Sequence, residues 1–280
     1  MHTGLRLLAP LLASSLLITG GTRAQTGADI LNRMLAEYEK RTEHVDNYTL
    51  IQETLGQETV AYFEKDVVDG RPVFRVRSAG LVGAPVPSED QDEGGWDDLY
   101  TTAPDLAARA EYSGRDNIQN HSVHVVTVND LHEIGFGTDA SMGDTDFEPT
   151  RGTFYVDAET WVVRRLVFEG EMTYEGEPHD VTSTIEFQEY REVDGMLHPF
   201  LISVRTEGLG EAMGPEMREQ YEEMKKELEQ MPEAQRQMVE RMMKEQMEAM
   251  EGMANQPGGG MTVEIRVKEL RVNSGPPAGR

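Results

Sequence analysis

The sequence predicts a mainly β protein of the α+β class: a curled antiparallel sheet with covering helices, interrupted by one helical insertion. Two observations carry this prediction. Within 151–207, Val181, Ile185 and Phe187 alternate with polar residues, which is the period-2 pattern of a strand with one buried face. Asp194-Gly195 then supplies a tight turn. Strands joined by such turns form an antiparallel meander, and a sheet of this size curls.

The segment before residue 80 predicts one helix and three hairpin strands. Apolar residues of 28–42 fall on one helical face, and Thr26 with Asp29 is a plausible capping pair. The strands are expected at 48–55, 59–68 and 72–78, with turns at Gly56 and Asp69-Gly70.

Between 80 and 149 the pattern is weaker. Loops that contain acidic residues and glycine are expected at 80–95 and 139–149, with weak helical character over 96–108. A strand that starts at Ala110 is expected to turn at 114–117 and to return over 122–128.

The stretch 211–257 is a Met- and Glu-rich helical insertion. Its apolar residues repeat at alternating steps of four and three, as in a coiled-coil seam. Pro232 suits a first helical position, so two helices are expected, at 215–230 and 232–251. An amphipathic face of this kind predicts a partner-binding surface made of Met217, Tyr221, Met224, Leu228, Met238 and Met242.

The last strand has the clearest alternation in the chain. Val263, Ile265 and Val267 alternate with polar residues, and the change of parity near Lys268 predicts a bulge. We therefore expect a single domain over 25–273, interrupted by the insertion, and a disordered tail over 274–280.

Residues 1–24 have the pattern of a secretory signal peptide. Arg6 precedes the apolar stretch 7–18, and Ala24 marks a cleavage site, so the mature chain is expected to begin at Gln25. The apolar stretch is too short to span a bilayer, which needs about 20 residues. The chain has no cysteine, which excludes disulfides and a lipid anchor on cysteine. These features predict a soluble periplasmic or secreted protein that does not span a membrane.

The charge limits the partners. The formal net charge is −25, so nucleic acid and anionic membrane surfaces would repel the chain. An acidic surface of this kind is typical of a highly soluble protein, and a basic partner remains possible.

Three phrases resemble a known family. They are Glu111-Tyr112-Ser113-Gly114-Arg115-Asp116, the stretch from Thr153 to Thr160, and the stretch from Tyr190 to Pro199. In this order, after one helix and three hairpin strands, they resemble the periplasmic lipoprotein carrier (LolA-like) and outer-membrane lipoprotein-sorting proteins. The resemblance implies an incomplete β-barrel that is lined with apolar residues, is lidded by helices and shields acyl chains from water.

Alternating apolar residues on the strands supply the candidate ligand site. Such residues are ordinary core or, on a curled sheet with few covering helices, line a cavity. We predict the second alternative, an acyl cavity made of Phe154, Val156, Ile185, Phe187, Phe200, Ile202, Val263, Ile265 and Val267. The expected function is sequestration of the acyl chains of a lipid or lipoprotein, as carrier or sensor. The alternative is a structural or regulatory envelope module that binds a protein through the Met-rich helices.

No catalytic or metal-binding motif can be read from the sequence. His132 lacks the second histidine, four residues on, that a zinc-protease helix needs. Carboxylates at 144–148 could hold calcium, and Met247, Met250 and Met253 could bind Cu(I). A solvated loop and an amphipathic helix are the preferred interpretations of these two stretches. We therefore predict no enzyme activity, no cofactor and no metal.

Overall fold

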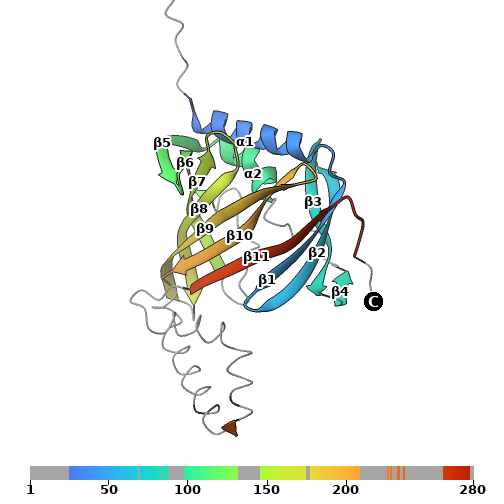
Figure 1. Ribbon diagram of the computed structural model, residues 1–280. Coiled ribbons are helices and arrows are strands. Elements are labelled where there is room, and N and C mark those ends of the chain that lie inside the picture. Colours follow the sequence, from blue (N-terminus) through green and yellow to red (C-terminus); the bar gives the residue numbers. More distant parts are fainter. Residues whose placement is uncertain are drawn as a thin grey trace, which may run out of the picture.

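The computed structural model (Figure 1) describes a sheet and two helices. The described residues are 25–68, 70–82, 84–87, 98–131, 146–174, 177–208 and 261–277, with Lys226, Leu228, Pro232, Glu233 and Arg236. The elements are α1 (Gly27–Thr42), β1 (Asn47–Thr54), β2 (Gln57–Val68), β3 (Arg71–Leu81), β4 (Ala84–Pro87), α2 (Asp98–Ala107), β5 (Ala110–Ile118), β6 (His121–Asn129), β7 (Asp146–Asp157), β8 (Val163–Tyr174), β9 (Glu177–Val193), β10 (Met196–Glu207) and β11 (Met261–Val272).

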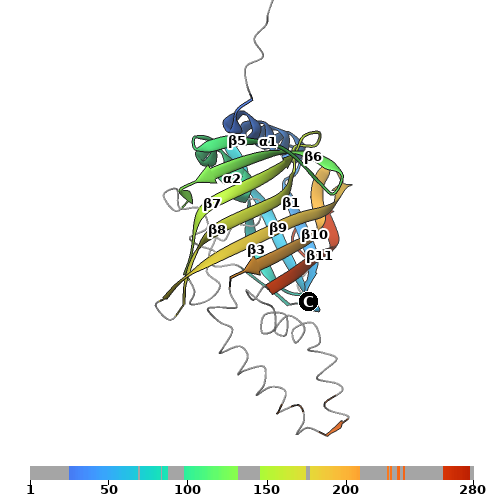
Figure 2. The ribbon, with the colours of Figure 1, turned by 90° about the vertical axis from the view of Figure 1, so that its left-hand side faces the viewer.

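The described strands form one antiparallel sheet. Its eleven strands lie in the order β4-β3-β2-β1-β11-β10-β9-β8-β7-β6-β5, so β11 inserts between β1 and β10. β4 and β5 lie at the two edges and do not pair with each other, so the sheet curls without closing (Figures 1 and 2). The predicted fold class, a curled antiparallel sheet that forms an incomplete barrel with covering helices, is confirmed.

Helix α1 forms where the sequence predicts a helix. The Thr26 side chain accepts a hydrogen bond from the Asp29 amide, and the Asp29 carboxylate accepts one from the Thr26 amide, which confirms the capping pair. Lys40 and Arg41 in the last turn complement the negative end of the helix dipole. The apolar residues on its buried face are Ile30, Leu31, Met34, Leu35 and Tyr38.

Helix α1 bridges the two arms of the curled sheet. It contacts β3 on one arm and β5, β6 and β10 on the other, and α2 contacts α1 and β3. The Lys65 ammonium on β2 donates to the carbonyls of Thr42 and Glu43 at the end of α1, at 2.7 and 2.8 Å. His44, after the helix, lies 2.7 Å from the carbonyl of Asp194 in the β9–β10 turn. These hydrogen bonds fix the end of the helix to both arms.

The bulge expected near Lys268 is confirmed. Ile51 pairs with Glu269 and Gln52 pairs with Val267, so the register of β1 skips Lys268. The extra residue keeps Val267 and Leu270 together in the buried core although an odd number of positions separates them.

The turn expected at 114–117 is wrong. β5 continues through these residues, and the chain reverses at Gln119 and Asn120, whose φ angles are 52° and 68°. Gly114 has a φ of 121°, which favours glycine, and the register with β6 skips Ser113 beside it. The glycine therefore accommodates a bulge inside the strand, whereas the turn is made by two non-glycine residues in the left-handed region.

Three further expectations differ from the structure. The first loop, expected over 80–95, is wrong at residues 80 and 81, which belong to β3, and at 84–87, where β4 pairs with β3. The second acidic loop is wrong over its last four residues, because β7 begins at Asp146, which pairs with Thr173. Helical character is confirmed over Asp98–Ala107, as one helix, α2, with Pro104 inside it, while residues 96 and 97 lie outside the described residues. Its Tyr100 and Leu106 are buried in the core, and this packing outweighs the low helix propensity of proline.

Several predicted features lie outside the described residues. These are the signal peptide, His132, residues 139–145, most of the 211–257 insertion, residues 278–280, and Met217, Tyr221, Met224, Met238 and Met242 of the predicted partner surface. Leu228, the sixth residue of that surface, is described and is 5% exposed. Asn273 ends the predicted domain, and its side chain accepts a hydrogen bond from the Asp46 amide at 2.7 Å and donates one to the His44 carbonyl at 2.9 Å.

Candidate functional site

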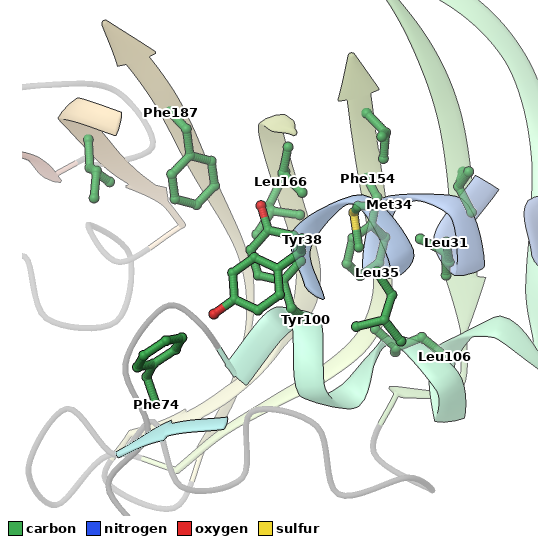
Figure 3. Close-up of a cluster of buried hydrophobic side chains, with 14 of the residues drawn as sticks. Leu31, Met34, Leu35, Tyr38, Phe74, Tyr100, Leu106, Phe154, Leu166 and Phe187 are labelled. Atoms are coloured by element: carbon green, nitrogen blue, oxygen red, sulfur yellow. The ribbon is translucent and has the colours of Figure 1, made fainter. Parts of the chain in front are cut away.

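The face of the sheet against which α1 and α2 pack is called the inner face here. Figure 3 shows how side chains from β7, β8 and β9 point toward α1: Phe187 and Leu166 lie near Tyr38, while Phe74 of β3 approaches from the other arm. The rings of Tyr38 and Tyr100 stack at 4.0 Å and join the two helices. The inner face is therefore closed by a packed core where the helices lie.

The nine residues predicted to hold acyl chains divide into two groups by burial. Six belong to the core cluster and are at most 8% exposed: Phe154, Val156, Phe187, Phe200, Ile202 and Val267. The other three, Ile185, Val263 and Ile265, are half-buried. The structure thus brings the nine onto neighbouring strands but leaves only three of them partly open to solvent.

The half-buried residues form a row across adjacent strands. Ile185 of β9 pairs with Val204 of β10, and Val204 pairs with Val263 of β11. On the other side of Ile185, Leu166 of β8 is its partner and is 4% exposed. We call Ile185, Val204 and Val263 the open row.

The next row toward α1 shows how burial changes along the strands. Phe187 pairs with Ile202, and Ile202 pairs with Ile265. Phe187 and Ile202 are buried and Ile265 is half-buried, whereas every member of the open row is half-buried. Exposure therefore rises from this row to the open row on β9 and β10, but it falls again farther from the helices, where Val181 of β9 is 3% exposed.

A second apolar cluster lies at the strand ends away from α1, and the sequence did not predict it. Met172 of β8 and Val181 of β9 are 4% and 3% exposed and pack with Phe147 of β7. Gly170 precedes them, and a Cβ there would lie 2.3 Å from the carbonyl oxygen of Glu148 on β7. This close approach of the backbones interrupts the apolar alternation, so no periodic signal leads from Phe168 to this cluster.

Val204 and Leu166 were also missing from the predicted set. Val204 continues the alternation of Phe200 and Ile202, and that signal could have included it. Leu166 follows two arginines, and its place on the inner face becomes visible only from its pairing with Ile185.

His198 is a fully buried polar residue of β10. It is 0% exposed, with ring centroids 6.4 Å from Tyr48 and 6.5 Å from Phe200. Burial lowers the pKa of His198 to about 3, because the charged imidazolium loses its hydration. The imidazole is therefore neutral at pH 7 and adds no charge to the core.

Arg164 lies at the α1 end of β8 and is held by Asp157. Its Nε lies 3.0 Å and a terminal nitrogen 2.9 Å from Asp157 Oδ2, and both side chains are buried. Burial works to raise the pKa of Asp157, but hydrogen bonds from the Thr160 and Glu159 amides and from Arg164 outweigh it and leave the pKa lowered. The positive charge of Arg164 is thus committed to an ionised carboxylate within the fold.

The β7–β8 turn packs against α1. Trp161 has a φ of 56°, stacks on His124 at 5.4 Å and lies 5.7 Å from the guanidinium of Arg33 on α1. Arg41 of α1 donates to the carbonyl of Thr160. Polar contacts therefore join apolar packing in holding the helix over this end of the sheet, and the open row lies on the side away from it.

Two further features were sought among the described residues, a cluster of metal-binding side chains and a membrane-spanning helix. No group of three or more His, Asp or Glu side chains there is arranged to hold a metal ion. None of its helices is both long enough and apolar enough to cross a bilayer.

Comparisons with known proteins give similarities in structure. No protein-family model and no curated protein matches the sequence. A domain from Vibrio parahaemolyticus whose description refers to outer membrane lipoprotein sorting is similar with a TM-score of 0.43 and 9% identity, over 90% of this chain and 94% of that one. A LolA superfamily protein from Nitrosomonas europaea is similar with a TM-score of 0.33 and 9% identity, over 90% and 96%.

A DUF1329 family protein from Desulfovibrio piger is also similar, with a TM-score of 0.40 and 10% identity, over 90% of this chain and 93% of that one. At these TM-scores and identities the likenesses carry no argument about function. The functional argument therefore rests on the residues of the inner face.

Proposed function

We propose that this protein is an exported, non-enzymatic binding protein that sequesters the acyl chains of a lipid or lipoprotein on the inner face of its sheet, as carrier or sensor. The observation that carries the proposal is the open row, Ile185, Val204 and Val263. These apolar side chains continue the buried core past the helices while remaining half-buried. Such partly exposed apolar surface beside a packed core can bind an apolar ligand, because burying both apolar surfaces removes them from water.

The buried residues have a different part in this proposal. Phe187 and Ile202 are buried in the core cluster that also contains the apolar residues of α1, so ligand contact is assigned to the open row and to Ile265. The proposed site is thus narrower than the nine residues that the sequence suggested. Its apolar character on adjacent strands suits a flexible hydrocarbon chain rather than a ligand that needs directed hydrogen bonds.

The energy available to such a site is set by the hydrocarbon removed from water. Each methylene group sequestered contributes about 0.8 kcal/mol, so about eight methylenes contribute roughly 6 kcal/mol. The loss of translational and conformational freedom on binding opposes this gain. Longer acyl chains should therefore bind this face more tightly than shorter ones, as far as their methylenes are removed from water.

Export is part of the proposal and rests on residues 1–24. A protein delivered outside the cytoplasm would meet acylated proteins and lipids at a membrane surface. In the alternative, the Met-rich helices bind a protein partner and no lipid is required. The molecule that co-purifies with the chain, a lipid or a second protein, distinguishes the two alternatives.

The test is mass spectrometry of an organic extract of the protein purified from its native envelope. We expect acylated species in at least a substantial fraction of molecules, and their loss from an Ile185→Asp variant purified in parallel. If neither extract contains lipid and a second polypeptide co-purifies with the wild type, the protein-binding alternative is supported and the acyl-binding proposal is refuted.

A further inference from the structure

Strands β1 and β2 continue the inner face beyond the open row. β1 lies next to β11 in the sheet (Figure 1), and Leu50 of β1 and Phe63 of β2 belong to the same core cluster as the apolar residues of α1. Because side chains alternate along a strand, Gln52 and Thr54 share the inner face with Leu50. The register agrees with this, since Thr54 pairs with Ile265 of β11.

The inner face of these two strands is polar but uncharged away from the core. Four neighbouring residues there carry amide or hydroxyl groups, and we call them the polar wall: Gln52 and Thr54 of β1, and their partners Thr59 and Gln57 of β2. The charged residues of the same stretches, Glu53 and Glu58, pair with each other on the opposite face of the sheet. Although 28% of the residues in the chain are charged, this part of the inner face therefore carries hydrogen-bonding groups without charge.

The polar wall has hydrogen-bonding capacity that the described fold does not use. Gln52, Thr54 and Thr59 are half-buried and Gln57 is exposed. No hydrogen bond joins these four side chains to another described residue. Polar groups that are partly removed from water without a partner weaken a fold. Stability therefore does not account for the polar wall, whereas a ligand with complementary polar groups would supply the missing partners.

The polar wall borders the proposed ligand site. Ile265, which is assigned to ligand contact, pairs with Ile202 of β10 on one side and with Thr54 of β1 on the other. Along this row the side chains change from buried apolar to half-buried apolar and then to uncharged polar. An amphiphile whose hydrocarbon lies on the open row would therefore meet the polar wall with its head group, where β11 adjoins β1.

We infer that the polar wall binds the head group of the acyl ligand, and that this head group is uncharged and carries hydroxyl or amide groups, as in an acylglycerol. Hydroxyl and amide side chains both donate and accept, so they recognise such a head group through neutral hydrogen bonds. This inference rests on the proposed function and adds the chemistry of the head group to it. It also assigns a binding role to β1 and β2, which supply none of the residues of the proposed acyl site.

The test uses the full mature chain and two ligands that share a lauroyl ester and differ in the head group. Monolauroylglycerol carries two free hydroxyls, and methyl laurate carries none. Each ligand is titrated as a competitor against an uncharged fluorescent acyl probe, in the wild type and in variants of the polar wall. The change in affinity that a variant causes is then compared between the two ligands.

The variant Gln52→Met with Thr54→Val removes hydrogen-bonding groups and keeps the side chains close to their original size. Its affinity for monolauroylglycerol should fall about fivefold or more, because each neutral hydrogen bond that is lost weakens binding by about two- to tenfold. Its affinity for methyl laurate should stay within about twofold of the wild type. The matched control, Thr182→Val with Thr184→Val, alters two half-buried threonines on the opposite face of β9 and should leave both affinities unchanged.

The outcomes separate this inference from the proposed function. Equal changes for the two ligands in the double variant, or no change for either, would overturn the inference while leaving acyl binding intact. If circular dichroism shows that the double variant does not fold, Thr54→Val alone supplies the measurement, with Thr54→Ser, which keeps the hydroxyl, as its control. A wild type that binds neither ligand nor the probe would refute the proposed function, and the inference with it.

Discussion

Replacing Ile185 by aspartate distinguishes a ligand-binding face from an ordinary core. Ile185 is half-buried in the middle of the sheet, between Leu166 and Val204 on the neighbouring strands. In a filled core an unpaired carboxylate at this place would unfold the protein, because it would lose its hydration without gaining a partner. On a face that solvent reaches, the carboxylate stays partly hydrated, but the face no longer accepts hydrocarbon.

The expected loss of stability follows from the burial. Full burial of an isoleucine side chain contributes about 1.5–3 kcal/mol, so losing a half-buried one costs roughly 1 kcal/mol. Partial desolvation of the carboxylate adds about 1–2 kcal/mol at a site that water reaches. The total of about 2–3 kcal/mol is smaller than the stability of a typical domain, about 5–15 kcal/mol, so the variant should fold. Phe187→Asp, two residues along the same face and 3% exposed, should fail to fold.

The assay combines thermal unfolding, followed by circular dichroism, with titration of an uncharged fluorescent acyl probe. Ile185→Asp should lower the unfolding temperature by roughly 5–10 °C, given about 2–4 °C per kcal/mol for a chain of this size, and should abolish probe binding. Thr184→Asp is the control, since Thr184 is equally half-buried on the opposite face of the same strand. Probe binding by Ile185→Asp at wild-type affinity would remove the open row from the site. Equal loss of binding in Thr184→Asp would show that the effect is not specific to the inner face.

Four other outcomes are expected. Asp157→Asn should lower the free energy of unfolding, measured with denaturant, by about 3–5 kcal/mol, because it leaves the buried Arg164 without its carboxylate. The pKa of Asp157 is lowered in the folded protein, so its contribution to stability is present above the unfolded pKa of about 3.9 and is lost as the pH falls through the folded pKa. The stability of the variant should therefore depend less on pH in the acid range. His198 also has a lowered pKa, about 3 in the folded protein against about 6.5 in the unfolded chain. As the pH is lowered from 6.5 to 3, the free energy of unfolding should therefore fall by up to about 1.4 kcal/mol per pH unit. His198→Phe should remove this pH dependence, and an unchanged dependence contradicts the assignment. Deletion of 212–257 with a short Gly/Ser link should leave a cooperative β transition in thermal melts, since Thr206 and Met261 already pair across the gap and doubling a loop costs only about 0.6 kcal/mol; loss of the transition would make the insertion part of the core. N-terminal sequencing of protein from the native envelope should read from Gln25, and an intact Met1 would contradict export by a cleaved signal peptide.

Local patterns were sufficient for the elements whose residues interact with near neighbours in sequence. The capping box of α1 needs only Thr26 and Asp29, three residues apart, and the apolar stripe behind it needs only helical spacing. The bulge at Lys268 is visible as a change of parity within one strand. For the same reason the β9–β10 turn at Asp194-Gly195 lies where the sequence places it.

The failures occur where one residue type serves two purposes or where a partner is distant. Gly114 among polar residues predicts a turn, yet its positive φ serves a bulge, and only pairing with β6 distinguishes the two. Met172 and Val181 make a cluster with Phe147 because the register of three strands brings them together, and no period within one strand announces it.

The sequence alone placed Ile185, Ile202 and Val263 on the apolar faces of their strands, because alternation along a strand fixes the side to which each side chain points. It could not determine which of them remain open to a ligand. Ile185 and Phe187 have the same parity on β9, but Phe187 lies beneath α1 and is buried, whereas Ile185 lies two residues farther away and is half-buried. That difference depends on the position of α1 across the curled sheet. Contacts with β3, β6 and β10 and hydrogen bonds with Lys65 and Asp194 set this position, and Asp194 and most of these strands are distant from α1 in the sequence.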